Sequence, residues 1–307
     1  MGTHLLRRLL REGHSVRALV HRPQAGSPGT GSPQTGSPAL QKLAQEQPGK
    51  LELMPGDVVS GAGVEEAIAG CEAAIHLVGI ILETGHASFE RVHVLATENV
   101  VRSAKRAGIG RYLQMSALGS RPDGASAYQR SKFRGEELVR GSGLQHVILR
   151  PSLIFGQGDG FVTQMVKIMK SAPLIRPVPG TGKYRFRPIY IDDVVECFAQ
   201  ALVNPAALNH VVSLVGGEEL PLEDLLRRIA DCIGVHKPAV KIPMPLMKSV
   251  ALLAGLLPMR PPVTLDQLKM LAQGSTADPR EMMEIFNFEP LKFTEGLRRY
   301  LCNTASN

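Results

Sequence analysis

The sequence of 307 residues contains no tryptophan, and only 5% of its residues are aromatic. Surfaces that bind single-stranded nucleic acid depend on aromatic side chains that stack on the bases, so this scarcity argues against a nucleic-acid partner. The formal net charge is +7, but the lysines and arginines are scattered and form no block of like charge. A positive balance of this kind suits anionic small molecules such as phosphorylated cofactors.

Cysteine is also scarce. The four cysteines are Cys71, Cys197, Cys232 and Cys302, and none has the sequence spacing of metal ligands. We therefore expect buried, reduced thiols and no metal site. Reduced thiols are typical of a reducing compartment, so we expect a cytoplasmic protein.

Long apolar segments are absent. The first residues contain no apolar core of a signal peptide. Residues 244–257 are the nearest candidate for a membrane span, but the segment is short for a bilayer and contains Lys248. We expect a core or interface helix there. This helix and a second apolar, Met-containing one at residues 264–273 leave open a protein partner, or association with a membrane complex from its periphery.

Strand and helix patterns alternate through the first half of the chain. The predicted strands cover residues 15–21, 51–54, 73–78, 112–116 and 146–150, and the predicted helices cover residues 3–11, 89–107 and 128–140. Strands separated by helices of this length indicate parallel βαβ units. We predict an α/β fold, with a doubly wound parallel sheet and a smaller C-terminal α/β lobe.

The predicted boundary between the sheet domain and this lobe lies at residue 155, so that residues 156–307 form a substrate or partner lobe interleaved with the sheet. Helices are expected at residues 161–170, 264–273 and 279–286, and a further one opens at Pro221. Gly-Ser-Pro recurs at positions 26, 31 and 36, which predicts a flexible loop insertion at about residues 24–40.

A glycine-rich turn is missing from its usual place. A dinucleotide-binding sheet opens with a strand and such a turn, whose amides meet the pyrophosphate at a helix N-terminus. Here Gly2 stands directly before the first helical pattern. We interpret Gly2 as the last glycine of the turn and expect that a misplaced start removed the first strand and two glycines. The alternative is that Gly2 is merely a small residue after the initiator and that the real first strand lies elsewhere.

The most informative residues present are Tyr128 and Lys132, which are four apart and therefore share one face of a helix. A nearby ammonium favours the phenolate and lowers the tyrosine pKa, which makes tyrosine usable as a general acid/base. Ser116, at the end of the preceding strand, is placed to hold a substrate oxygen. This arrangement suits hydride transfer between a carbonyl and an alcohol, although Tyr-x-x-x-Lys also occurs by chance in many helices.

The end of the second strand of the predicted sheet bears on cofactor choice. An acidic residue at this place binds the ribose hydroxyls of NAD and repels a 2′-phosphate. This chain has His21 and Arg22 there and no acid. Arg22 can pair with a 2′-phosphate, so we predict a preference for NADP over NAD. The alternative is that Arg22 is a solvated loop residue.

Together these motifs resemble the short-chain dehydrogenase/reductases. Ser116, Tyr128 and Lys132 match the family's catalytic set. The segments 115–119, 149–156 with 158–160, and 186–194 are similar to the atypical extended branch, and more closely to bacterial relatives of the nucleotide-binding accessory subunit of respiratory complex I. Segment 264–271 supports that subgroup. The resemblance implies that residues 1–155 form an NAD(P)-binding Rossmann domain.

The resemblance also implies roles for single residues. Tyr128 is the expected general acid/base, Lys132 binds the nicotinamide ribose and lowers the tyrosine pKa, and Ser116 orients the substrate carbonyl. The cofactor would contact Asp57 and Val58 at the adenine, pass along Leu77, Val78 and Gly79, and meet Pro151, Ser152, Leu153 and Ile154 at the nicotinamide.

Two departures from the family pattern stand out. His93 replaces the asparagine that usually holds a relay water, and Leu153 replaces the asparagine of the sugar-nucleotide epimerase pattern. The second departure disfavours an epimerase. Two functions therefore remain open: an NAD(P)-dependent oxidoreductase that acts on a small carbonyl or alcohol, and a non-catalytic nucleotide-binding subunit of a respiratory or membrane-associated complex.

Overall fold

The structure, a computed structural model, describes residues 1–21, 37–85, 87–172, 174–255 and 263–302. The chain divides into two compact units that each contain several stretches of sequence. The first unit comprises Met1–Ser116, Ser131–Leu149 and Val195–Val211, and the second comprises Ala117–Arg130, Arg150–Val194 and Val212–Asn307.

Parallel strands form the centre of the first unit. Strand β1 (Val16–His21) pairs with β2 (Leu51–Gly56), while β4 (Arg111–Met115) pairs with β3 (Ala73–His76) on one side and with β5 (His146–Pro151) on the other. The strands β3, β4 and β5 belong to one sheet, which also contains β10 (Val211–Leu214) beside β5, in the order β10-β5-β4-β3. The prediction of an α/β fold with parallel strands is confirmed.

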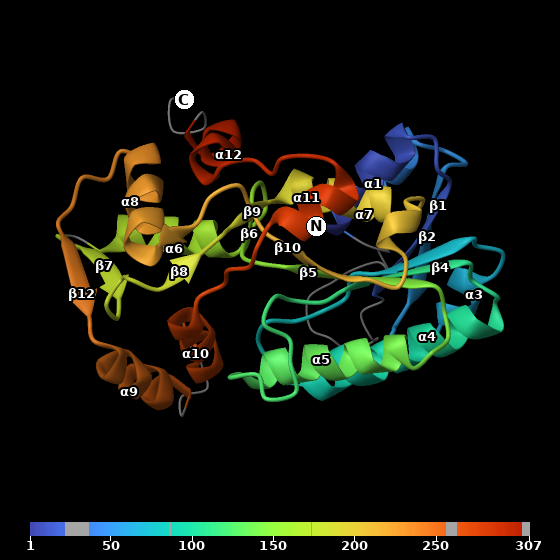
Figure 1. Ribbon diagram of the computed structural model, residues 1–307, viewed down its shortest axis with the longest axis horizontal. Helices are drawn as coiled ribbons and strands as arrows, with labels where there is room; N and C mark the ends of the chain where they lie inside the picture. Colours follow the sequence, from blue (N-terminus) through green and yellow to red (C-terminus); the bar gives the residue numbers. More distant parts are fainter. Residues whose placement is uncertain (22–36, 86, 173, 256–262, 303–307) are drawn as a thin grey trace. The chain divides into compact units, whose positions relative to one another are not determined.

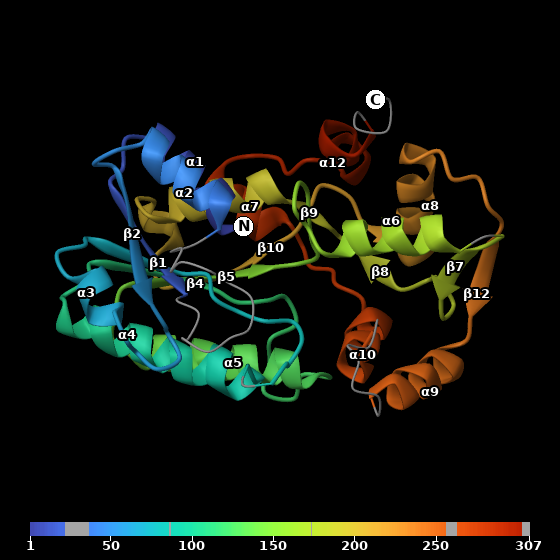
Figure 2. The same cartoon turned by 180° about the vertical axis from the view of Figure 1, so that it is seen from behind.

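Helices cover both faces of these strands, as the two views of the ribbon show (Figures 1 and 2). The helices α3 (Val64–Ile68), α4 (Ala96–Arg106) and α5 (Ala127–Arg140) lie on one face, and α1 (Gly2–Arg11) lies on the other with α7 (Ile191–Ala201). Tyr112 and Ile148 are fully buried against Val100 and Val139, which forms the core beneath α4 and α5. Strands β4 and β5 are mostly buried on both faces, as the central strands of a parallel sheet are.

The predicted helix at residues 89–107 begins irregularly. Its first six residues form a π-helix, η1 (Glu90–Leu95), which continues into α4. Helix α5 approaches this turn closely at Gly135. A Cβ on this glycine would lie only 2.7 Å from the carbonyl oxygen of His93. Such π-bulges occur often at functional sites, so this turn marks His93 for attention.

Residues near the predicted insertion are only partly described. The first two Gly-Ser-Pro repeats and Arg22 lie outside the described residues. The last repeat contributes Ser37 and Pro38, which begin helix α2 (Pro38–Glu46) as its N-cap and first residue. The predicted flexible loop therefore does not extend to residue 40. Proline is favoured in the first turn of a helix, which explains how the third repeat starts one.

The second unit combines short strands with helices. Strand β7 (Arg176–Pro179) pairs with β12 (Ala239–Ile242), β8 (Arg185–Phe186) with β11 (Leu220–Pro221), and β6 (Ile154–Phe155) with β9 (Ile189–Tyr190). The helices are α6 (Phe161–Ser171), α8 (Leu222–Cys232), α9 (Met244–Gly255), α10 (Leu265–Gln273), α11 (Arg280–Phe286) and α12 (Phe293–Tyr300). Within the described ranges, no helix is both long and apolar enough to cross a bilayer.

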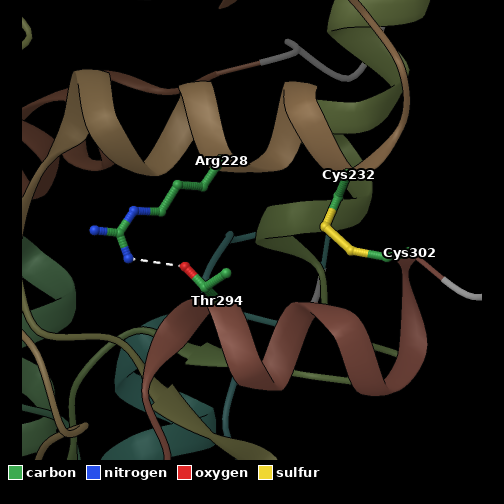
Figure 3. The surroundings of a disulfide bond; sticks show 4 residues. All are labelled: Arg228, Cys232, Thr294 and Cys302. Carbon is green, nitrogen blue, oxygen red and sulfur yellow. Dashed lines mark hydrogen bonds between the residues drawn. A yellow bond between two sulfur atoms is a disulfide. The ribbon is translucent and has the colours of Figure 1, made fainter.

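The expectation of four reduced thiols is wrong for one pair. Cys232, at the end of α8, forms a disulfide with Cys302, which follows α12 (Figure 3). The same two helices are joined by a hydrogen bond of 2.8 Å from Arg228 to the hydroxyl of Thr294. The two cysteines are 70 residues apart in sequence, so only the packing of α8 against α12 brings them together. Cys71 and Cys197 keep reduced thiols, as expected.

Candidate active site

Lys132 lies on α5 with only 4% of its surface exposed. Its Nζ donates a hydrogen bond of 3.0 Å to the carbonyl oxygen of Met115. Met115 is the last residue of β4, so the ammonium lies at the carboxyl end of a parallel strand, where open α/β sheets bind ligands. Burial lowers the pKa of Lys132 to about 8, and the negative charge of Glu136 opposes that shift.

Ser116 follows Met115 and is also buried. Its Oγ donates a hydrogen bond of 2.5 Å to Oε1 of Glu136. The other carboxylate oxygen of Glu136 accepts a hydrogen bond of 2.9 Å from Arg140. The proton of the Ser116 hydroxyl is therefore directed at a carboxylate on α5, whereas the family resemblance expects it to face a substrate carbonyl.

His93 joins a second buried set of polar groups. The amide of Ile80 donates to His93 Nε2 at 3.0 Å, so Nε2 must be the unprotonated nitrogen. The other ring nitrogen, Nδ1, then carries the proton and donates to the hydroxyl of Ser131 at 2.8 Å. Burial and the charge of Lys132 lower the pKa of His93 to about 3, which keeps the imidazole neutral at physiological pH.

The segment after β3 brings Gly79 against these groups. A Cβ at Gly79 would lie 2.9 Å from Lys132 Nζ and 3.5 Å from His93 Nε2. Any larger residue would therefore displace the ammonium or fill the space beside it. Leu77 and Val78 precede Gly79 on the same connection, and the side chain of Val78 is 41% exposed. Leu77 to Gly79, Ser116 and Lys132 thus lie around the ends of two neighbouring strands of the first unit.

Tyr128 belongs to the first turn of α5 and is half-buried. The carboxylate of Asp266 fixes this end of the helix by accepting a hydrogen bond of 2.9 Å from the amide of Ala127. Burial raises the pKa of Tyr128 to about 12. The prediction that Lys132 lowers the pKa below its ordinary value is therefore wrong for this structure, because the loss of water around the phenol dominates.

The ends of β1 and β2 carry a separate group of predicted cofactor residues. His21 Nδ1 lies 4.0 Å from a carboxylate oxygen of Asp57. That carboxylate accepts a hydrogen bond of 2.9 Å from the amide of Val59, and the carbonyl oxygen of Val58 accepts one of 3.0 Å from Asn99. These bonds hold the turn after β2 in one shape. Gly2 is exposed at the start of α1.

The predicted nicotinamide segment, Pro151 to Ile154, belongs to the second unit from its first residue. The hydroxyl of Ser152 donates to the carbonyl oxygen of Arg187 at 2.6 Å, so its proton is used within the protein. Leu153 and Ile154 are half-buried, and Ile154 pairs with Ile189 of β9. Among the described residues, Nε of Arg187 is buried without a hydrogen-bond partner.

Sequence reasoning missed three buried polar residues near Lys132: His76, Ser131 and Glu136. A spacing signal was available for Glu136, which lies four residues after Lys132 as Lys132 lies four after Tyr128. His76 ends β3, and burial together with the Lys132 charge lowers its pKa to about 3. Nothing in an apolar strand pattern distinguishes this histidine from a core residue.

A doubly wound parallel arrangement, with a buried lysine and a close glycine at the strand ends, defines a Rossmann-type α/β protein. The sequence profile of the NAD dependent epimerase/dehydratase family matches residues 1–215. The chain belongs to this family. The resemblance inferred from the motifs is thereby confirmed at the level of the family.

Individual relatives point in two functional directions. The chain is 28% identical over 262 residues to the mitochondrial NADH dehydrogenase (ubiquinone) 1 alpha subcomplex subunit 9 of Mus musculus, covering 82% of this chain and 68% of that protein. It is 24% identical over 245 residues to the ceramide reductase of Caulobacter vibrioides, covering 80% and 71% respectively.

A solved structure shows the same fold. The UDP-glucuronic acid 4-epimerase from Bacillus cereus, in complex with UDP-glucuronic acid and NAD, superposes with a TM-score of 0.75 at 15% identity. The match covers 99% of this chain and 95% of the epimerase. At this identity the likeness concerns the fold, and the substrate of the epimerase does not transfer with it.

Proposed function

We propose that this protein is an NAD(P)(H)-dependent oxidoreductase that acts on a small carbonyl or alcohol, with Tyr128 as the general acid/base. The observation that carries the proposal is the burial of Lys132, one helical turn from Tyr128, at the end of β4. Removing an ammonium from water costs several kcal/mol. A protein that only binds a nucleotide has no need of the lysine–tyrosine pair, whereas carbonyl chemistry uses it.

The residues beside Lys132 fit a nicotinamide dinucleotide. Gly79 leaves open the space beside the ammonium that a Cβ would fill, 2.9 Å from Nζ. Lys132 would bind the ribose hydroxyls, and the backbone of Leu77 to Gly79 would lie along the cofactor. The bound cofactor supplies the hydride, and the chain supplies the orientation and the proton.

The protonation state of Tyr128 favours reduction. With a pKa of about 12, the phenol keeps its proton at neutral pH and can donate it to a carbonyl oxygen that receives a hydride. Alcohol oxidation needs the phenolate instead, which burial disfavours. The protonated phenol is therefore suited to act as the acid when a carbonyl compound is the substrate.

For the cofactor we infer a preference for NADP(H). The side chain of His21 is 71% exposed at the end of β1. The Asp57 carboxylate beside it already accepts a hydrogen bond from an amide of its own turn, and Arg22, which follows His21 in the sequence, can pair with a 2′-phosphate. Titration of both reduced cofactors into the protein, followed by their fluorescence, tests this inference. Equal or tighter binding of NADH contradicts it.

Activity is tested by mixing the purified protein with NADH or NADPH and a panel of small aldehydes and ketones. The loss of NAD(P)H absorbance measures the rate. Tyr128→Phe is expected to lower the rate by roughly 10² to 10⁴-fold and to leave cofactor binding unchanged, because only the transferred proton is lost. Tyr184→Phe, a half-buried tyrosine elsewhere in the second unit, is the matched control and should retain full activity. Equal rates for the two variants would contradict the assignment.

The alternative function is a non-catalytic nucleotide-binding subunit of a respiratory complex. The observation in its favour is the 28% identity to a protein that is named as a subunit of NADH dehydrogenase. Complementation separates the two functions. A strain that lacks the protein and is fully restored by Tyr128→Phe supports the binding role, whereas restoration by the wild-type protein alone supports catalysis.

A further inference from the structure

Glu136 is a fully buried carboxylate, with 0% of its surface exposed. It lies on α5 one turn after Lys132, and its two oxygens have different partners. Oε1 accepts the proton of the Ser116 hydroxyl at 2.5 Å, and Oε2 accepts a hydrogen bond of 2.9 Å from the half-buried Arg140. An isolated buried carboxylate is strongly unfavourable, so these donors and nearby positive charges must compensate its loss of water.

The first consequence concerns the direction of the Ser116 hydrogen bond. A serine hydroxyl has one proton and two lone pairs, while an ionised carboxylate can only accept. Both oxygens of Glu136 accept hydrogen bonds here, one from the Ser116 hydroxyl and one from the Arg140 guanidinium. Once Ser116 donates its proton to Glu136, only its lone pairs remain for other groups, so it accepts from a ligand rather than donating to one.

The second consequence concerns Lys132. Burial disfavours its ammonium, and the negative charge of Glu136 acts in the opposite direction. The two residues lie four apart on one helix, so the rigidity of α5 fixes their separation. The ammonium is also held at the strand end by the Met115 carbonyl oxygen, at 3.0 Å. One carboxylate therefore acts on two members of the candidate catalytic set.

We infer that Glu136 is a positioning residue of the active site: it fixes the Ser116 hydroxyl as a hydrogen-bond acceptor and keeps Lys132 in its charged form. The inference rests on the proposed function for its meaning in catalysis. It adds that the group facing Ser116 in the bound state is a donor, such as the hydroxyl of the alcohol form of the substrate. Tyr128 alone then donates to the substrate carbonyl.

The decisive comparison is between Glu136→Gln and Glu137→Gln. The neighbouring Glu137 is exposed and also pairs with Arg140, so its substitution removes a nearby charge without touching Ser116. The readout is the titration of Lys132 by NMR of ¹³Cε-labelled lysine, with the signal assigned by its absence in Lys132→Arg. Glu136→Gln should lower the midpoint by about 1 pH unit, and Glu137→Gln should leave it unchanged. Equal midpoints in the two variants overturn the inference.

A measurement on the wild-type protein covers the case in which Glu136→Gln does not fold. A hydroxyl proton held between Ser116 and a carboxylate is buried and exchanges slowly, so it should give a low-field proton signal that disappears in Ser116→Ala. Its absence in the wild type overturns the assignment of Ser116 as an acceptor. Neither NMR experiment needs enzyme activity, so failure of this inference is distinct from failure of the proposed function, which the Tyr128→Phe assay decides.

An activity readout then separates positioning from mere structural support. If Glu136 keeps Lys132 charged, the alkaline limb of the rate profile should move to lower pH in Glu136→Gln by the same interval as the NMR midpoint. At pH 6, where Lys132 stays charged in both proteins, cofactor affinity should be unchanged. A uniform loss of rate and affinity at every pH indicates a structural role only and contradicts the inference.

Discussion

The ammonium of Lys132 donates to the carbonyl oxygen of Met115 at 3.0 Å, which ties helix α5 to the end of strand β4. Its pKa is about 8 in the folded protein, below the ordinary value of 10.5. Between these values the unfolded chain binds more protons than the folded one, so the free energy of unfolding rises with pH in this window.

Lys132→Met removes this dependence. We expect the variant to be at least as stable as the wild type at pH 7, because it buries no ammonium. The advantage should shrink by up to about 3 kcal/mol as the pH rises to 10.5, since the folded wild-type lysine is then neutral and no longer buries a charge. Urea unfolding at several pH values measures the effect. Lys105→Met, an exposed lysine on α4, is the control, and pH curves that stay parallel for Lys132→Met would contradict the assignment.

The buried histidines predict a loss of stability in acid. His76 and His93 have folded pKa values of about 3, compared with an ordinary value of 6.5. Because the unfolded chain takes up these protons first, stability is present above pH 6.5 and is lost as the pH falls toward 3. Each histidine should account for about 2 kcal/mol of the loss between pH 7 and pH 5.

Substitution by glutamine isolates this contribution, since glutamine does not titrate. The difference in unfolding free energy between pH 7 and pH 5 should be smaller in His76→Gln than in the wild type. His14→Gln, on an exposed histidine, should behave as the wild type does. The same loss in all three proteins would show that other groups cause the acid sensitivity.

Gly79→Ala tests the space beside the lysine. The new methyl group would lie 2.9 Å from Lys132 Nζ, so the ammonium has to shift. We expect cofactor affinity to fall by at least tenfold, about 1.4 kcal/mol, with little change in stability because the lysine side chain is flexible. Gly110→Ala is the matched control, since its nearest neighbour is at 3.5 Å, an ordinary contact. Unchanged affinity in Gly79→Ala would remove Gly79 from the cofactor site.

The disulfide predicts a thiol count. In the denatured, unreduced protein a thiol reagent should react with two cysteines, Cys71 and Cys197, and with four after reduction. Closing a loop of 70 residues is expected to stabilise the fold by about 4 kcal/mol through chain entropy, so Cys232→Ser should lower the unfolding free energy by up to this amount. Cys71→Ser should leave the bridge intact. A count of four thiols before reduction contradicts the bond.

Local patterns in the sequence predicted much of the sheet and its helices. The strand expected at residues 146–150 appears as β5 (His146–Pro151), and the helix expected at 128–140 appears as α5 (Ala127–Arg140). Strand β5 is buried on both faces and helix α5 is amphipathic, so the spacing of apolar residues within each segment is enough to predict it. The π-turn at His93 and the short strands of the second unit lack such a signal, because they depend on contacts made by distant segments.

The candidate site likewise has features that local spacing predicts and features that depend on packing. Helical spacing by itself placed Lys132 one turn from Tyr128, because residues four apart share a face of any α-helix. The sequence could not decide the direction of the tyrosine pKa shift, which depends on how much water the folded chain removes from the phenol.

The sequence by itself determined the family and the parallel α/β architecture, and it singled out Tyr128 and Lys132 as candidates for proton transfer. Only the tertiary structure decided that the Ser116 proton goes to Glu136, that Gly79 lies against the lysine and that Cys232 meets Cys302. Helical and strand periodicities extend over a few residues, whereas each of these contacts joins residues that are far apart along the chain and meet only when the elements pack.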